Sequence, residues 1–209
     1  MSHAFTNQLP PKLEETFTPR RVIKCGPSVR YSLLSGIALG LAGLLTSCAD
    51  HSDVPRAAAT VALINTSGAN VGSAELTEDN NGLVTLKVNV KGLPAGIHGI
   101  HFHEVGVAEP NASPAFSTSG EHYNPASKKH GLENPQGTHA GDLPNLIVES
   151  QGTGSLETTT NRISLTDGPM TLFDANGSSL IIHVGVDDQK TDPSGNSGGR
   201  IAGGVVVRK

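Results

Sequence analysis

The stretch HGIHFHEVG, residues 98–106, places His98, His101 and His103 within six positions. In a β-strand, residues i and i+2 point to the same face, so His101 and His103 would present two imidazoles side by side, with Phe102 on the opposite face. His183 lies in a second apolar run, LIIHV. Imidazole nitrogens suit borderline metals such as copper and zinc. These strand histidines therefore predict a metal site.

A long irregular stretch, 105–143, carries four further candidate ligands, His122, His130, His139 and Asp142. A loop of this length in a compact domain needs a reason, and a bound ion that clips the loop together supplies one. Three imidazoles and one carboxylate fill four positions and leave none for a substrate. Closed four-ligand coordination is typical of structural zinc, so this set predicts a zinc site.

The elements that must position these side chains are predicted to be strands. Aromatic residues make up 3% of the 209 residues, while Gly (25) and Pro (13) are abundant, which favours short strands and turns over a helical bundle. From Thr60 onward apolar residues recur with a period of two, and 79–82 (DNNG) is a predicted hairpin turn. Eight strands are expected, near residues 60–65, 70–78, 83–90, 96–104, 145–150, 154–165, 179–184 and 200–207. This pattern predicts an all-β, antiparallel sandwich or barrel.

Charge and cysteine content exclude two further features. The formal net charge of −4 gives no electrostatic support for nucleic-acid binding, which favours a basic face. The two cysteines are Cys25 and Cys48, so no disulfide can form within Ala49–Lys209.

The first quarter of the chain resembles an export signal. An apolar run, 31–45, follows the basic residues Arg20, Arg21, Lys24 and Arg30; it is short for a membrane span but suits a signal-peptide core. The run ends in Leu45-Thr46-Ser47-Cys48, which resembles the lipobox of bacterial lipoproteins, where the chain is cleaved before the cysteine and the cysteine is acylated. We expect a signal peptide with an extended N-terminus at 1–47, a lipidated Cys48 with a flexible tether over 48–59, and the folded domain over 60–209. The alternative is a buried helix with a chance cysteine.

The motifs of the folded domain resemble those of the copper/zinc superoxide dismutase family, from about Val61 to the C-terminus. In chain order they are HGIHFH (98–103), GEHYNPASKKHG (120–131), THAGDLPN (138–145), LIIHVGVDD (180–188) and GNSGGRIAGG (195–204). The resemblance implies a flattened eight-stranded antiparallel Greek-key barrel, an immunoglobulin-like sandwich with long metal-binding loops.

The resemblance also implies a role for each candidate site residue. The copper ligands would be His101, His103, His122 and His183, and the zinc ligands His122, His130, His139 and Asp142. His122 belongs to both sets and would bridge the two metals as an imidazolate. Asp187 matches a carboxylate that links one copper-ligand ring to one zinc-ligand ring. Arg200 matches the arginine beside the copper that receives the anion, and His98 matches a structural histidine that is not a ligand.

The activity implied by the resemblance is superoxide dismutation, an antioxidant reaction. Copper would cycle between Cu(II) and Cu(I), oxidising one superoxide to dioxygen and reducing the next to hydrogen peroxide. Zinc has no redox chemistry, so it would serve structure and electrostatics. His122 would take up a proton when its bond to Cu(I) opens and deliver it as peroxide forms. The Arg200 guanidinium is expected to select the small anion.

Two departures from the family concern charge and covalent structure. The loop between His183 and Arg200 is shorter than in eukaryotic members and has Lys190 as its one cation, so Lys128 and Lys129 become candidate steering charges. Their alternative role is that of ordinary surface lysines. The family's intramolecular disulfide is absent, and its two cysteines align with Phe116 and Gly203. We expect Phe116 to pack over Gly203 and to restrain the loop by apolar burial.

The leading hypothesis is an exported superoxide dismutase, anchored through Cys48 to a membrane and facing the periplasm or the cell exterior. Its partners would be superoxide and the membrane, with no nucleic acid, and both a monomer and a homodimer are compatible with the sequence. A second hypothesis is a non-catalytic protein that holds zinc or stores copper on the same fold. A third, a structural or adhesive β-domain on a lipid anchor, leaves the histidine pattern unexplained.

Overall fold

The computed structural model describes residues 54–209, so the predicted signal peptide and Cys48 lie outside the described residues. The strands are β1 (Ala57–Asn65), β2 (Asn70–Glu78), β3 (Val84–Val90), β4 (Gly96–His98), β5 (Ile100–His103), β6 (Leu146–Val148), β7 (Gly154–Thr160), β8 (Ser179–His183) and β9 (Arg200–Arg208). The described part has one helical element, the 3-10 turn η1 (Ser117–Ser119). Every strand pair is antiparallel. The all-β, antiparallel prediction is confirmed.

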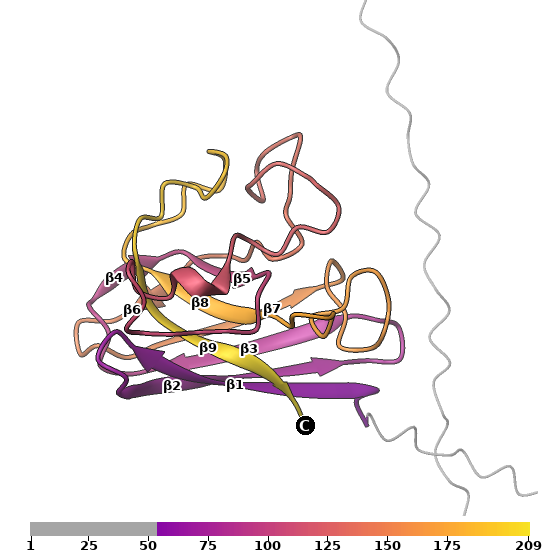
Figure 1. Ribbon diagram of the computed structural model, residues 1–209, viewed down its shortest axis with the longest axis horizontal. Helices are drawn as coiled ribbons and strands as arrows, with labels where there is room; N and C mark the ends of the chain where they lie inside the picture. Colours follow the sequence, from indigo (N-terminus) through magenta and orange to yellow (C-terminus); the bar gives the residue numbers. More distant parts are fainter. Residues whose placement is uncertain (1–53) are drawn as a thin grey trace, which may run out of the picture. The chain divides into compact units, whose positions relative to one another are not determined.

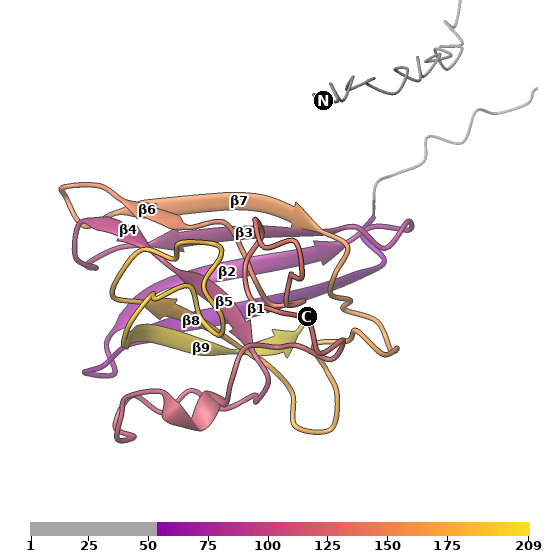
Figure 2. The same ribbon diagram turned by 90° about the horizontal axis from the view of Figure 1, so that it is seen from above.

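The strands form a nearly closed barrel in the order β4-β6-β7-β3-β2-β1-β9-β8-β5. The two strands at the ends of this order, β4 and β5, are consecutive in the chain and separated by Gly99 alone. β4 pairs with β6 and β5 pairs with β8, so this one stretch of chain joins the two edges of the sheet (Figures 1 and 2). The connection from β3 to β4 passes β7 and β6, and the connection from β7 to β8 likewise skips strands, which is a Greek-key arrangement.

The strand expected over 96–104 is divided at Gly99, which gives nine strands in place of eight. The Gly99 N–H donates to the Gly185 carbonyl at 2.8 Å, and the Gly99 carbonyl accepts from the His183 N–H at 2.8 Å. A Cβ at this position would lie 2.8 Å from the Ser197 Cβ, so only glycine allows the β8–β9 loop to approach this closely. The break therefore brings the loop that follows His183 against the strand that carries His101.

Alternation along the strands builds the core. In β3, Val84, Leu86, Val88 and Val90 are buried, while Lys87 and Asn89 are exposed. The hairpin turn expected at 79–82 is present, because Asp79 Oδ1 accepts from the backbone N–H of Asn81 at 2.8 Å and of Leu83 at 2.9 Å. Each fully buried aliphatic side chain of this kind is worth about 1.5–3 kcal/mol.

β5 and β8 differ from the other strands because every one of their residues is buried. One face of these strands lines the core, and the other lies beneath the β5–β6 and β8–β9 connections. Figure 1 shows both connections, in pink and gold, rising from this side of the barrel, while β1 and β2 form the opposite side. The strand histidines therefore lie between the barrel and two long loops.

Two strand boundaries differ from the expected ones by three residues or more. β1 begins at Ala57, inside the segment expected as a tether, because Ala57–Ala59 pair with Glu78–Leu76 of β2. Alanine is too small to give a periodic signal, so the pattern missed these residues. β7 ends at Thr160 in place of 165, where the Thr160 hydroxyl accepts from the Arg162 N–H at 3.1 Å. Within 54–209, no helix has the length and apolar character needed to cross a bilayer.

Candidate metal centre

Three strand histidines meet at the side of the barrel that the loops cover. His101 and His103 lie on β5 opposite Ile181 and Ser179 of β8, and His183 is the last residue of β8. The β8–β9 register shifts between Ile182 and His183, and His183 faces Arg200. The extra residue is on β9, so the bulge brings Arg200 opposite His183, while His183 shares the β8 face of Ser179 and Ile181 that is paired with the β5 histidines. The rings of His101 and His183 lie 4.9 Å apart between centroids.

The loop histidine His122 is brought to these strands by backbone pairing along the edge of β5. The Tyr123 N–H donates to the Phe102 carbonyl at 2.8 Å, and the Phe102 N–H donates to the Gly141 carbonyl at 2.9 Å. The backbone of His103 thereby forms an antiparallel β-bridge with that of His122, and the backbone of His101 forms one with that of Asp142. The middle and the C-terminal end of this ligand loop, 105–143, are thus paired to the strand that carries the first histidines, which fixes a loop with little regular structure of its own.

The first donor set consists of four histidine nitrogens that point at one another. His101 Nδ1, His103 Nε2, His122 Nε2 and His183 Nε2 are buried and have no hydrogen-bond partner among the described residues. The ligand atoms of these four residues lie within 4.8 Å of one another. Buried polar atoms rarely go unpaired, so four convergent nitrogens of this kind indicate a site for a metal ion.

The outer nitrogens of these rings fix the tautomers. His103 Nδ1 lies 3.0 Å from the Gly120 carbonyl, and His183 Nδ1 lies 2.9 Å from the Gly198 carbonyl. A carbonyl oxygen can only accept, so the proton of each ring is on Nδ1 and the inner nitrogen carries a free lone pair. His101 Nε2 is held in the same way by Asp187 Oδ2 at 2.7 Å. The rings are therefore oriented as ligands before any metal arrives.

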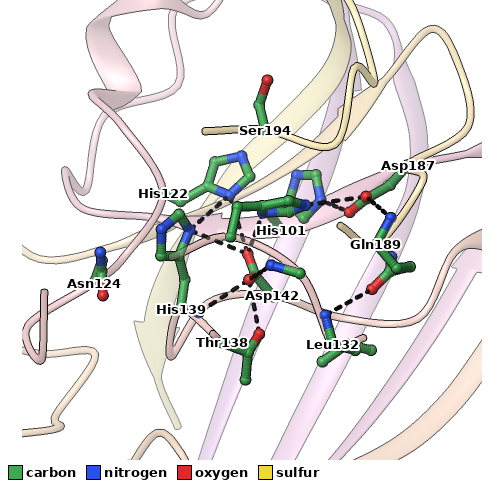
Figure 3. Close-up of polar contacts among 12 residues, drawn as sticks. His101, His122, Asn124, Leu132, Thr138, His139, Asp142, Asp187, Gln189 and Ser194 are labelled. Atoms are coloured by element: carbon green, nitrogen blue, oxygen red, sulfur yellow. Dashed lines mark hydrogen bonds and ion pairs between the residues drawn. The ribbon is translucent and has the colours of Figure 1, made fainter. Parts of the chain in front are cut away.

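The second donor set is centred on Asp142. Its Oδ1 lies 3.1 Å from His122 Nδ1, 2.9 Å from His130 Nδ1 and 3.4 Å from His139 Nδ1. Its Oδ2 accepts from three donors, the Gly131 N–H at 2.8 Å, the Thr138 hydroxyl at 2.8 Å and the His139 N–H at 3.0 Å. Figure 3 shows Asp142 between the His139 ring and the Thr138 hydroxyl. Three nitrogens and one oxygen converge here, as in a closed zinc site.

Two residues connect the donor sets. His122 offers Nε2 to the first set and Nδ1 to the second. Asp187 accepts from His101 Nε2 with one oxygen and lies 3.0 Å from His130 Nε2 with the other. The positions of the two sets are therefore coupled through one ring and one carboxylate.

Asn145 and Gln189, neither of which was predicted as a site residue, hold Asp187 in place. The Asn145 amide donates to the Asp187 carbonyl at 2.8 Å and accepts from the Asp187 N–H at 2.9 Å. The Gln189 N–H donates to Asp187 Oδ1 at 2.6 Å (Figure 3). The signal for Asn145 was its place in the THAGDLPN motif, which also contains a candidate ligand.

Burial sets the protonation of the first set. It lowers the pKa of His101 to about 3 and that of His183 to about 4, and it also holds the pKa of His103 well below its usual value. Neutral imidazole is the form that binds metals, so these residues need lose no proton near neutral pH.

Carboxylates set the protonation of the second set. Burial alone would lower the pKa of His130, but hydrogen bonds to Asp142 and Asp187 outweigh it and raise the pKa to about 9. Burial would raise the pKa of Asp142, yet hydrogen bonds from three histidines hold it far below its usual range. The metal-free second set therefore holds protons where an ion would supply the positive charge.

Arg200 lies beside the first set. Its Nη1 donates to the Phe116 carbonyl and its Nη2 to the Gly120 carbonyl, both at 2.6 Å. The Gly120 carbonyl also accepts from His103, so one carbonyl separates the guanidinium from a candidate ligand ring. A guanidinium has five N–H donors, so three stay available for an anion.

The lysines considered as steering charges are partly neutralised. Lys129 Nζ lies 2.8 Å from Asp192, and Lys190 Nζ lies 2.8 Å from Glu133. Lys128 forms no ion pair within residues 54–209, and it lines the same surface hollow as His139 and Lys129. The positive potential around this hollow is therefore weaker than the lysine count suggests.

Phe116 and His98 lie where the sequence analysis expects them. A Cβ built on Gly203 would lie 3.3 Å from Phe116 Cδ1, and the Phe116 ring is fully buried. His98 contacts two backbone carbonyls, of His183 at 2.8 Å and of Pro94 at 2.9 Å, and belongs to neither donor set. The ring of Phe116 thus packs against a residue without a side chain, as the missing disulfide led us to expect.

Comparisons with known proteins identify the family of this chain. Residues 70–206 match the sequence profile of the family described as copper/zinc superoxide dismutase (SODC). Superoxide dismutase (Cu-Zn) 2 of Aquifex aeolicus is 43% identical over 175 residues, which cover 83% of this chain and 98% of that protein. Superoxide dismutase (Cu-Zn) of Caulobacter vibrioides is 39% identical over 142 residues, which cover 66% of this chain and 79% of that protein. The crystal structure of a double mutant of a superoxide dismutase-like protein from Bacillus subtilis aligns with a TM-score of 0.66 at 39% identity, over 71% of this chain and 96% of that one.

Proposed function

The chain belongs to the copper/zinc superoxide dismutase family and is an oxidoreductase acting on superoxide with copper and zinc as cofactors, and from this premise we propose which residues perform each role and where the protein works. Copper is held by His101, His103, His122 and His183, and zinc by His122, His130, His139 and Asp142. The observation that carries this assignment is the group of four buried, unpartnered nitrogens in the first set.

Two superoxide anions and two protons give one dioxygen and one hydrogen peroxide. Copper, when bound, supplies the one-electron oxidation and reduction that this reaction needs, and zinc supplies a fixed positive charge. Arg200 binds the anion through its free N–H groups, since a guanidinium at the mouth of the first set favours a small anion over a neutral molecule. The same residue fixes the loop, because it holds two of the loop's carbonyls.

His122 is the residue that moves a proton. Its Nε2 faces the first set and is buried without a partner, while its Nδ1 is held beside Asp142 Oδ1. A ring fixed through Nδ1 can gain and lose a proton at Nε2 without rotating away. This placement favours delivery of a proton to the reduced oxygen species, and the Asp142 side keeps the ring oriented throughout.

The proposed protein is exported and lipid-anchored. The supporting features are the basic residues, the apolar run 31–45 and the lipobox-like sequence before Cys48. Acylated Cys48 would hold the domain at a membrane that faces the periplasm or the cell exterior, where superoxide from outside reaches it first.

A non-catalytic metal-binding role is the second candidate. One relative in Bacillus subtilis is 38% identical over 149 residues and is named a superoxide dismutase-like protein. That name describes a likeness to superoxide dismutase and does not state the activity. The two roles differ in whether the bound metals turn over superoxide.

Metal analysis combined with superoxide decay after pulse radiolysis distinguishes the two candidates. The full chain, loaded with one copper and one zinc, should consume superoxide at a rate that scales with copper content. Zinc-only protein serves as the control and should be inactive. A chain that binds both metals stoichiometrically yet leaves superoxide decay unchanged would refute the catalytic role and support the second candidate.

A further inference from the structure

The β7–β8 connection, 161–178, contributes no ligand to either donor set, yet it contacts the ligand loop at three points. Arg162 Nη2 donates to the Asp142 carbonyl at 2.7 Å. The Tyr123 hydroxyl donates to the Thr171 carbonyl at 2.7 Å, and the Gly106 N–H donates to the Asn176 carbonyl at 2.8 Å. The β7–β8 connection therefore packs against the ligand loop at its start, its middle and its end.

Arg162 makes the contact nearest to a ligand. The Asp142 residue whose carbonyl it holds is the one whose carboxylate gathers the three Nδ1 atoms. The Arg162 Nε is buried and has no partner within residues 54–209. Burying part of a guanidinium costs free energy that an apolar side chain would not. A contact of this cost, aimed at one backbone atom of a ligand, points to a role at the metal site.

The connection that carries Arg162 is itself fixed to the barrel. The buried carboxylate of Glu78, at the end of β2, accepts from the Leu165 N–H at 2.5 Å and from the Ser164 hydroxyl at 3.1 Å. Arg208 Nη1, at the end of β9, donates to the Leu165 carbonyl at 3.1 Å. Arg162 thus links the start of the β7–β8 connection, which is anchored to β2 and β9, to Asp142, the last residue of the second donor set.

We propose that Arg162 is a positioning residue of the zinc site: by holding the Asp142 carbonyl, it keeps the Asp142 carboxylate directed at the three Nδ1 atoms. The proposal rests on the assignment of zinc to the second donor set. The flanking backbone is held by other contacts, since the Gly141 N–H donates to the Tyr123 carbonyl at 2.9 Å and the Gln189 amide to the Leu143 carbonyl at 3.2 Å, whereas Arg162 is the donor to the Asp142 carbonyl itself. Without Arg162, the Asp142 carboxylate would keep its three donors, but the Asp142 carbonyl would lose the contact that fixes the direction of the carboxylate.

The test uses the copper- and zinc-loaded full chain and two Arg162 variants. Arg162→Gln is too short to reach the Asp142 carbonyl, and Arg162→Lys keeps the charge and much of the length. Arg208→Gln is the matched control, since it removes another arginine-to-carbonyl bond to the same connection without touching the ligand loop. Zinc retention is measured against a competing chelator, and the site geometry by the visible spectrum of cobalt(II) bound in place of zinc.

Arg162→Gln should weaken zinc retention about 10–100-fold and broaden the cobalt spectrum, as loss of a residue that orients a ligand typically does. Arg162→Lys should recover most of the retention, and Arg208→Gln should lower the unfolding temperature but stay within about threefold of wild type in zinc retention.

Equal losses of zinc retention in Arg162→Gln and Arg208→Gln would overturn the proposal, because they would show that Arg162 stabilises the fold in general and not the zinc site in particular. If Arg162→Gln does not fold, Arg162→Ala takes its place, and wild-type zinc retention with a wild-type cobalt spectrum in that variant would equally overturn the proposal. Failure of the wild-type chain to bind zinc at all would overturn the assignment of the second donor set as well.

Discussion

The substitution Phe116→Ala tests whether apolar packing restrains the ligand loop where the family has a disulfide. Phe116 is fully buried, outside the main core cluster, with its ring against Gly203. Its carbonyl accepts from Arg200, so the same residue places the guanidinium. Alanine would remove the ring and leave a cavity, because Gly203 has no side chain to fill it.

The expected cost is at the low end of the range for a buried aromatic. Phe→Ala in a core costs about 3–5 kcal/mol, of which part is the cavity that remains. The loop around Phe116 has little regular structure and can partly collapse, so we expect a loss of about 3 kcal/mol in the free energy of unfolding. For a domain of this size the loss lowers the unfolding temperature by about 6–12 °C.

The assay separates the loop from general stability by means of a second variant. Leu76→Ala removes a fully buried side chain of the main core, on β2, and should destabilise the fold by a comparable amount. Both variants, loaded with copper and zinc, are compared by thermal unfolding and by metal retention during dialysis against a chelator. Phe116→Ala should lose copper and activity faster than Leu76→Ala at equal stability, because Arg200 and the ligand loop become mobile together.

Equal metal retention in the two variants would refute the loop-restraint argument, and unchanged stability in Phe116→Ala would refute the packing itself. The converse experiment replaces both residues, Phe116→Cys with Gly203→Cys. The Phe116 ring carbon Cδ1 lies 3.3 Å from where a Cβ on residue 203 would be, so the two residues are neighbours, and the cysteine pair should oxidise spontaneously provided that their Cα atoms lie within about 7 Å and Ile181 moves aside. A double variant that stays reduced under oxidising conditions would place the loop on a different path.

Four further predictions concern metals, charge, pH and location. His101→Ala should abolish dismutation while zinc stays bound, and His139→Ala should lose zinc and thermal stability before copper; metal analysis that finds zinc lost from His101→Ala would contradict the division of ligands. Because Lys129 and Lys190 are paired with carboxylates, the rate constant for superoxide dismutation should change less than about twofold between about 0.01 and 0.15 M salt, and a steeper fall that Lys128→Ala removes would show that Lys128 steers superoxide. Burial holds the pKa of His101 at about 3 and of His183 at about 4, so below pH 6.5 the unfolded chain binds protons that the folded metal-free chain does not. The free energy of unfolding, measured with urea, should therefore be about 1–3 kcal/mol lower at pH 5 than at pH 7.5. The raised pKa of His130 works in the opposite direction and offsets only part of this effect. Cys48→Ala protein should leave the membrane fraction, and its retention there would contradict the lipid anchor.

The fold was largely predictable from periodicity. Strands such as β3 alternate between buried residues and half-buried or exposed ones, so the pattern indicates both the strand and its inner face. The pattern failed where side chains are small or where both faces are buried. Ala57–Ala59 gave no signal at the start of β1, and the break at Gly99 depends on a loop 86 residues further along the chain, at Gly185.

The candidate ligands were also predictable, because their chemistry is carried by residue type. His101 and His103 share a face in any strand, and three histidines with an aspartate in one irregular stretch are typical of a metal site. The supports were not predictable from type. Asn145, Gln189 and Arg162 are ordinary polar residues in the sequence, and nothing local distinguishes them from surface residues.

The sequence by itself thus determined the candidate donor residues, the strands that carry some of them and the length of the loop that carries the rest. Only the tertiary structure decided which nitrogen of each ring faces a donor set and which contacts hold that ring. It placed His122 with one nitrogen in each set, fixed the His103 and His183 tautomers through the Gly120 and Gly198 carbonyls, and set Arg162 against Asp142. The physical reason is that residue type and periodicity are local properties of the chain, whereas a hydrogen bond to a backbone carbonyl depends on which distant segments the closed barrel brings within about 3 Å of each other.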